Sequence, residues 1–211
     1  MKRMVCLLLL ALGLPVAAFA NSGTDFMNSG GTLTGTSAGL MLTGSTLTGV
    51  NNLGGSGKLK QGPNLGSVIF TTGALTSGSL QMGGIFAAGG AFQITGDGDN
   101  GVPNTMIFNG TFSGPLTWTM VQLANGTHYY TLSGSLTGTW YTGVTVNGAT
   151  VQLSINTGIG FFNGTTTIAG GDTNMVSSVP EPGTLNLLGT GFVALAGVLS
   201  RKWRSNLSLY P

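Results

Sequence analysis

Alternation of apolar and polar residues is the feature of this sequence that most constrains its fold. Within residues 116–120, 144–146 and 151–155 every second residue is apolar, and Thr, Gln or Ser stands between them. A period of two residues gives a β-strand one apolar and one polar face. Asn-Gly pairs readily adopt the positive φ angles of two-residue hairpin turns. Such pairs, three of them between candidate strands, occur at 109–110, 125–126, 147–148 and 163–164.

This pattern, together with the absence of heptads or any long helical periodicity, predicts an all-β fold. We expect residues 104–169 to form a β-meander. Earlier strands are expected near 37–50, 64–72, 79–87 and 90–96. An antiparallel β-sandwich or a partly closed barrel of roughly eight to ten strands is the first choice. A β-solenoid is the second choice, because Leu-Thr-Gly recurs, although at irregular spacing.

Charge is scarce and lies mostly at the two ends of the chain. Only 6% of the 211 residues are charged, against about a quarter in ordinary globular domains. Residues 21–182 hold two lysines and five acidic residues, a net charge of −3. A domain that binds nucleic acid needs a basic patch, so nucleic acid is excluded as a partner.

The first 20 residues predict a signal peptide. Basic residues 2–3 precede an apolar run over residues 4–16, and small residues Ala18 and Ala20 stand before Asn21. This arrangement fits cleavage by signal peptidase ahead of Asn21. The alternative is an uncleaved anchor, for which the run is short against the roughly 20 residues of a membrane span. Cys6, the only cysteine, lies in this segment, so the mature protein would contain no disulfide.

The C-terminal region predicts a membrane anchor preceded by a rigid handle. Residues 185–200 are largely apolar and would extend about 24 Å as a helix at 1.5 Å per residue, somewhat less than a hydrocarbon core. A basic cluster follows, and such clusters stay on the cytoplasmic side. Upstream, Pro180 and Pro182 hold the backbone extended around Glu181, so that a processing enzyme can reach it.

These linked features resemble the PEP-CTERM sorting domain of Gram-negative, exopolysaccharide-producing bacteria. The resemblance covers residues 178–204 and implies recognition by an exosortase, a membrane transpeptidase-like cysteine enzyme. It implies cleavage near Pro-Glu-Pro, a transient span of the inner membrane over residues 185–200, and transfer to the cell surface or extracellular matrix. The implied recognition and retention residues are Pro180, Glu181, Pro182, Arg201, Lys202 and Arg204. A plain tail anchor is the alternative, and the continuation to Pro211 departs from the family's usual ending.

The expected organisation therefore has four parts. They are the signal peptide (1–20), a β-rich extracellular domain (21–178), the sorting signal (179–204) and a short tail (205–211).

Few polar residues of the extracellular domain suggest chemistry. His128 is the only histidine, and we expect it on the exposed flank of a hairpin rather than in a catalytic or zinc site. Asp97 and Asp99 sit in a Gly-rich string that predicts a tight surface turn. A calcium loop of the EF-hand type needs a closing glutamate where Phe108 stands. We expect no cofactor and no metal.

Aromatic residues offer a second kind of site. Trp118 is in phase with its apolar neighbours and is expected in the core. Tyr130, Trp140 and Tyr141 are possible glycan contacts, with burial in the sheet as the alternative. Residues 54–60 predict a mobile loop, and its two lysines, Lys58 and Lys60, are expected at a solvated tip rather than on an anionic polymer.

The sequence thus favours a non-enzymatic secreted protein of the surface, biofilm or extracellular matrix. It would be exported across the inner membrane as an anchored precursor, with signal peptidase and exosortase as processing partners. A module that binds surface exopolysaccharide is the alternative. A hydrolase of matrix polymers, using Asp97, Asp99 or His128, is the third possibility.

Overall fold

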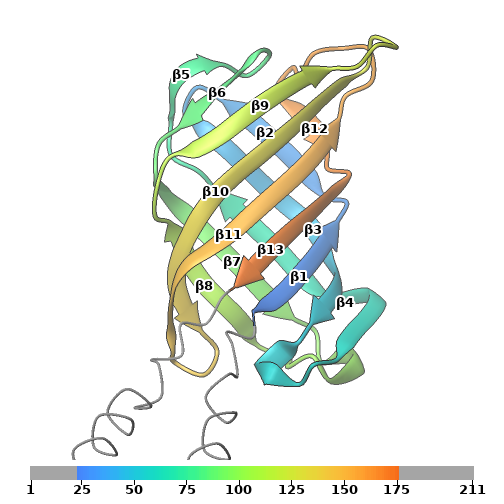
Figure 1. Cartoon of the computed structure of the whole chain (residues 1–211), viewed down its shortest axis with the longest axis vertical. Helices are drawn as coiled ribbons and strands as arrows, with labels where there is room; N and C mark the ends of the chain where they lie inside the picture. The colour runs from blue at the N-terminus through green and yellow to red at the C-terminus, as the bar shows by residue number, and fades with distance from the viewer. Residues whose placement is uncertain (1–22, 176–211) are drawn as a thin grey trace, which may run out of the picture. The chain divides into compact units, whose positions relative to one another are not determined.

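A computed structural model of the chain describes residues 23–175 (Figure 1). These residues form one antiparallel sheet of thirteen strands with two short 3-10 turns, Leu53–Gly55 and Asp99–Gly101. The strands are β1 (Thr24–Ser29), β2 (Thr32–Thr36), β3 (Gly39–Asn51), β4 (Leu59–Thr71), β5 (Leu75–Ser79), β6 (Gly83–Phe86), β7 (Gly89–Gly96), β8 (Met106–Phe112), β9 (Leu116–Gln122), β10 (His128–Trp140), β11 (Thr145–Asn156), β12 (Thr165–Thr167) and β13 (Gly170–Met175).

Eight of the strands close into a barrel. The ring runs β1–β3–β4–β7–β8–β10–β11–β13 and returns to β1, where Thr24 lies opposite Met175. The first and last strands of the described chain are therefore neighbours, as Figure 1 shows. This confirms the all-β prediction and, among the expected architectures, the barrel. The ring is closed rather than partly closed, and its strands pair antiparallel rather than stacking as solenoid turns.

The remaining strands extend the barrel wall because long strands change partners along their length. Residues 128–133 of β10 pair with β9, whereas residues 136–140 pair with β8. β9 in turn pairs with β6, and β6 pairs with β5. In the same way β2 lies beside β3 and carries the short strand β12. The barrel thus has a broad outer surface made by β9, β10, β11 and β13 (Figure 1).

The apolar faces of most strands point into a continuous core. Trp118 is buried as predicted and stacks on Tyr130, with ring centroids 5.0 Å apart and Phe162 against the edge of the Trp118 ring. A second cluster joins the rings of Phe70, Phe92, Phe108 and Phe112. Such close aromatic packing stabilises the barrel beyond the burial of area alone.

The predicted strands correspond to β3, β4 and β7, but the prediction at 79–87 is wrong in form. That stretch contains the end of β5, a turn and β6, which together make a hairpin. Asn125-Gly126 lies in the hairpin loop between β9 and β10, but the loop spans residues 123–127 rather than two residues, and only Gly126 has a positive φ. Asn147-Gly148 is not a hairpin turn. It forms a bulge inside β11, where Gly148 has a φ of 80° and the register with β10 shifts.

Within residues 23–175 no helix is long and apolar enough to cross a membrane. The predicted signal peptide, the sorting signal with its helix over residues 185–200, and the tail all lie outside the described residues.

Candidate functional site

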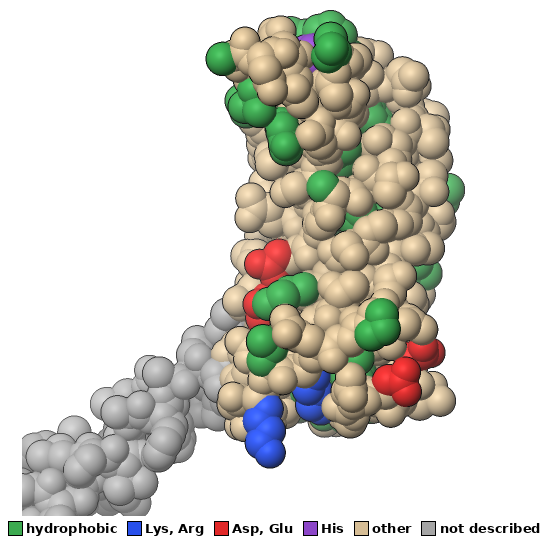
Figure 2. All heavy atoms as spheres, turned by 90° about the vertical axis from the view of Figure 1, so that its right-hand side faces the viewer, with side chains coloured by type: hydrophobic (Ala, Val, Ile, Leu, Met, Phe, Trp, Pro, Cys, Tyr) green, Lys and Arg blue, Asp and Glu red, His purple; other side chains and the backbone are tan. Residues whose placement is uncertain are grey.

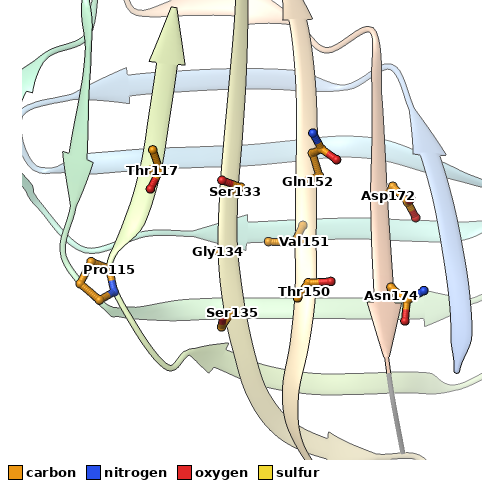
Figure 3. Close-up of a pocket in the computed structure, with 10 residues that line it drawn as sticks. All are labelled: Pro115, Thr117, Ser133, Gly134, Ser135, Thr150, Val151, Gln152, Asp172 and Asn174. Atoms are coloured by element: carbon orange, nitrogen blue, oxygen red, sulfur yellow. The ribbon is translucent and has the colours of Figure 1, made fainter. Parts of the chain in front are cut away.

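A polar groove of about 490 Å³ crosses the outside of the barrel wall (Figure 3). It lies over four neighbouring strands, β9, β10, β11 and β13. Six of its ten lining residues carry a hydroxyl or amide side chain, and one carries a carboxylate. The lining residues are Pro115, Thr117, Ser133, Gly134, Ser135, Thr150, Val151, Gln152, Asp172 and Asn174.

The strand register arranges these side chains in two rows. Thr117 lies opposite Ser133, Ser133 opposite Gln152, and Gln152 opposite Asp172. Two residues further along the strands, the second row is Ser135, Thr150 and Asn174, and Asp25 on β1 continues it beyond the groove lining. Residues two apart share a face of a strand, and adjacent strands lie about 4.8 Å apart. The groove is therefore a fixed grid of hydrogen-bond donors and acceptors, which Figure 3 shows over the outer strands.

The intervening residues explain why the grid is rigid. Val151 and Leu132 are buried in the core, whereas their neighbours Gln152 and Ser133 face outward. Since a one-residue slip would expose the apolar set, burial of the inner face fixes the positions of the outer side chains. Packing of the core therefore determines the geometry of the groove.

A pair of carboxyl groups ends the grid on the β1–β13 side. Burial, the hydrogen bond with Asp172 and the charge of Asp172, in that order, raise the pKa of Asp25 from its ordinary 3.8 to about 7. The Oδ1 atom of Asp25 is buried, with no N–H or O–H donor from the described residues beside it. A buried carboxylate oxygen without a donor is costly, and a proton on Asp25 lowers that cost. Asp25 therefore keeps its proton to a higher pH than an ordinary aspartate does.

This pair makes stability depend on pH. A raised pKa in the folded state means that the stabilisation is complete below about pH 3.8 and is lost as the pH rises through about 7. We expect the thermal unfolding midpoint of wild type to fall as the pH rises from 5 to 8. The midpoint of the Asp25→Asn variant should change much less over the same range. Asp97→Asn is the matched control, because Asp97 is exposed and accepts a hydrogen bond from Asn64 at 2.6 Å. Equal pH dependence in wild type and Asp25→Asn would contradict the raised pKa of Asp25.

The predicted glycan contact at Tyr130 is wrong. Its ring is fully buried, and its hydroxyl donates to the Gln81 carbonyl at 2.8 Å and accepts from the Phe162 amide at 3.0 Å. No sugar can reach it. Trp140 is half-buried beside Phe26, and Tyr141 is exposed next to it, with ring centroids 5.5 Å apart. Trp140 and Tyr141 remain a predicted contact, outside the groove.

His128 is also placed differently from the prediction. It starts β10 but is only 4% exposed, and its ring lies 4.3 Å from that of Phe161. Neither ring nitrogen has a hydrogen-bond partner among residues 23–175. The apolar loop that carries Phe161 covers the ring, which the local sequence around His128 does not reveal.

The remaining polar candidates lie where simple turns place them. Asp97 and Asp99 flank a surface turn as predicted, with Gly98 and Asn100 at positive φ. Lys60 donates to the Gly101 carbonyl and so ties β4 to that turn rather than standing at a solvated tip. The described residues hold no group of three or more His, Cys, Asp or Glu side chains that could bind a metal ion.

Comparison with known families concerns the C-terminal region. Residues 178–202 match the PEP-CTERM protein-sorting motif. This chain carries a PEP-CTERM sorting motif. The PEP-CTERM match includes Pro180, Glu181, Pro182, Arg201 and Lys202, whereas Arg204 lies just beyond it. The motif indicates export, processing by an exosortase, and sorting to the cell surface or extracellular space. No curated protein and no solved structure matches the chain.

Sequence reasoning missed both the groove and the carboxyl pair. The outward-facing Ser, Thr and Gln residues were visible as the polar half of each alternating strand. What assembles them is the pairing of strands distant in sequence, above all β1 with β13, which joins Asp25 to the neighbourhood of Asp172.

Proposed function

We propose that this protein is a non-enzymatic component of the cell surface or extracellular matrix and that it binds a surface polysaccharide in the outer groove. The observation that carries the binding role is the double row of mainly hydroxyl and amide side chains on rigid neighbouring strands. Sugar hydroxyls both donate and accept hydrogen bonds, as Ser, Thr, Asn and Gln side chains do. Each row spans four strands, about 14 Å at the usual strand spacing, which suits a polymer better than a single sugar.

The low charge of the groove favours a ligand polymer that carries little negative charge. Its only ionisable lining residue is Asp172, which hydrogen-bonds to Asp25. The two lysines of the described residues lie on the β3–β4 connection and on β4, away from these strands. A strongly anionic polymer would meet no counter-charge here.

Two observations favour binding over hydrolysis. The carboxyl groups of Asp25 and Asp172 hydrogen-bond to each other. They therefore lie closer together than the roughly 5 Å that separates the two carboxyl groups of retaining glycosidases. The other residues considered for a hydrolase do not come together: Figure 2 shows the histidine near the upper end of the described domain, with the acidic side chains of that face below it. Asp97 and Asp99 follow β7, whereas His128 begins β10.

The groove predicts the result of a paired substitution. Replacing Thr117 and Thr150 by valine keeps the side-chain shape and removes two hydroxyl groups from the grid. At about 0.5–1.5 kcal/mol for each hydrogen bond, affinity for the bound polysaccharide should fall roughly tenfold. The measurement is binding of the processed protein to a panel of neutral and host-derived polysaccharides. Thr43→Val, at an exposed position on β3, is the control and should bind like wild type.

A second location for the same function remains open at Trp140 and Tyr141. If replacing both by alanine abolishes binding while Thr117→Val with Thr150→Val has no effect, the aromatic pair is the site and the groove is not. If wild type binds no polysaccharide of the panel, the binding role is refuted and a purely structural role is left.

A further inference from the structure

Six large apolar side chains project from one end of the barrel. Ile159 is 80% exposed and Met82 64%, and the others are between about a third and a half exposed. They come from the β5–β6 turn, the β9–β10 hairpin and the β11–β12 connection. Figure 2 shows hydrophobic side chains gathered at the upper end, around the histidine. We call this set the apolar end: Met82, Val121, Leu123, Tyr129, Ile159 and Phe161.

Backbone and ring contacts show that these loops are adjacent. Val121 and Tyr129 are cross-strand partners in the β9–β10 hairpin. The His128 amide donates to the Gly158 carbonyl at 2.7 Å, and the His128 ring contacts Phe161, so the β11–β12 connection lies against the hairpin. The Tyr130 hydroxyl bonds to both Gln81 and Phe162, which brings the β5–β6 turn to the same place.

Contacts with the core hold these loops in place. Trp118 donates its indole N–H to the Leu80 carbonyl at 2.8 Å, and its ring packs on Tyr130 and Phe162 in the core. The exposed residues therefore sit directly on a buried aromatic cluster. Because that cluster fixes the backbone, the exposed apolar side chains cannot turn inward without breaking it.

Charge is absent from this end. Residues 80–86, 121–129 and 157–162 contain no Lys, Arg, Asp or Glu, and all charged residues of the described chain lie on other segments. The start of β1 and the end of β13 lie at the other end of the barrel (Figure 1). Exposed apolar surface of this kind is uncommon on a soluble monomer and marks a contact site.

We propose that the apolar end inserts into the interfacial region of a lipid bilayer. Its side chains project from three loop tips, and a fluid lipid surface can accept such a projecting set without a matching concavity, which a folded partner would have to supply. The lack of basic residues favours zwitterionic lipid, since nothing at this end attracts an anionic headgroup. The inference requires only that the protein is exported, and it does not depend on polysaccharide binding.

Flotation with phosphatidylcholine vesicles tests the proposal. The exosortase-processed protein should be used, because the precursor retains its own apolar segment over residues 185–200. Wild type should float with the vesicles to the same extent at low and high salt, since the contact is apolar. Ile159→Ser combined with Met82→Ser should lower the partition coefficient by about tenfold or more, because both side chains lose apolar area available for burial.

The control is Met41→Ser with Ile69→Ser, which changes the same two residue types at positions 44% and 40% exposed on β3 and β4, away from the apolar end. This variant should float like wild type. So should Thr117→Val with Thr150→Val, which separates lipid binding from the groove. Absence of flotation, equal flotation of the Ile159 and Met82 variant, or binding that needs anionic lipid and disappears in high salt would each overturn the proposal. A further outcome would also overturn it: wild type binds no vesicles but forms a dimer that the Ile159 and Met82 substitutions dissociate. The apolar end would then contact a second copy.

Discussion

Replacing Pro180 and Pro182 by alanine is expected to leave nearly all of the protein as unprocessed precursor. Both prolines lie in the PEP-CTERM match, and each locks one backbone angle of the segment that the exosortase must recognise. Alanine frees these angles, so that recognition of an extended segment carries an added entropic cost. Mass spectrometry of the terminal peptides should find wild type beginning at Asn21 and ending near residues 180–182. The variant should keep the peptide that contains Arg201 and Lys202.

Pro63→Ala provides the control for this experiment, because Pro63 is an exposed proline of β4 far from the sorting motif in sequence. It should be processed like wild type. A strain without the exosortase should reproduce the Pro180 and Pro182 variant. If wild type keeps its Arg201–Arg204 tail even when the exosortase is present, the segment is a plain membrane anchor, and the proposed surface or matrix role loses its support.

The second large effect concerns stability: Phe92→Ala should lower the free energy of unfolding by about 3–5 kcal/mol. The Phe92 ring is fully buried and packs on Phe70, Phe108 and Phe112 at centroid distances of 5.9–6.2 Å. The chain has a single cysteine and so no internal disulfide to limit the loss. Urea unfolding of the purified protein measures it, and Phe92→Leu should lose less because the cavity left is smaller.

Met41→Ala is the comparison, since Met41 lies on the outer face of β3. It should change stability by no more than about 0.5 kcal/mol. If both substitutions cost the same, the aromatic cluster would not be the stabilising core of the barrel.

The sequence allowed prediction of the strands and of the inner face of several of them. Trp118 was expected in the core because it alternates in phase with Leu116 and Met120, and it is buried there. The same argument applies to Tyr130, which is in phase with Leu132 on β10 and equally buried. Its misassignment came from treating the aromatic residues as a group instead of extending the phase of each strand.

Other features depend on partners that local sequence does not specify. The groove rows exist because β9, β10, β11 and β13 pair in one register. Burial of His128 depends on Phe161, which lies on a connection more than 30 residues further along the chain. The bulge at Gly148 looked like a hairpin turn because both structures require the same positive φ angle. Alternation of apolar and polar residues predicts which face of a strand a residue occupies. Pairing between strands distant in sequence determines which residues lie beside it on that face.

The pairing of β1 with β13 has a consequence for the timing of folding. If the predicted signal peptide leads the chain through the inner membrane, β1 emerges first and β13, at residues 170–175, emerges last. Contacts that join distant parts of a chain form late, because the intervening loop must be ordered first. The ring therefore cannot close until the whole barrel sequence has crossed, when the sorting motif at residues 178–202 is the next segment to arrive. Strand order thus couples completion of the fold to the moment of sorting, and a barrel truncated before β13 would reach the exosortase stage without ever closing.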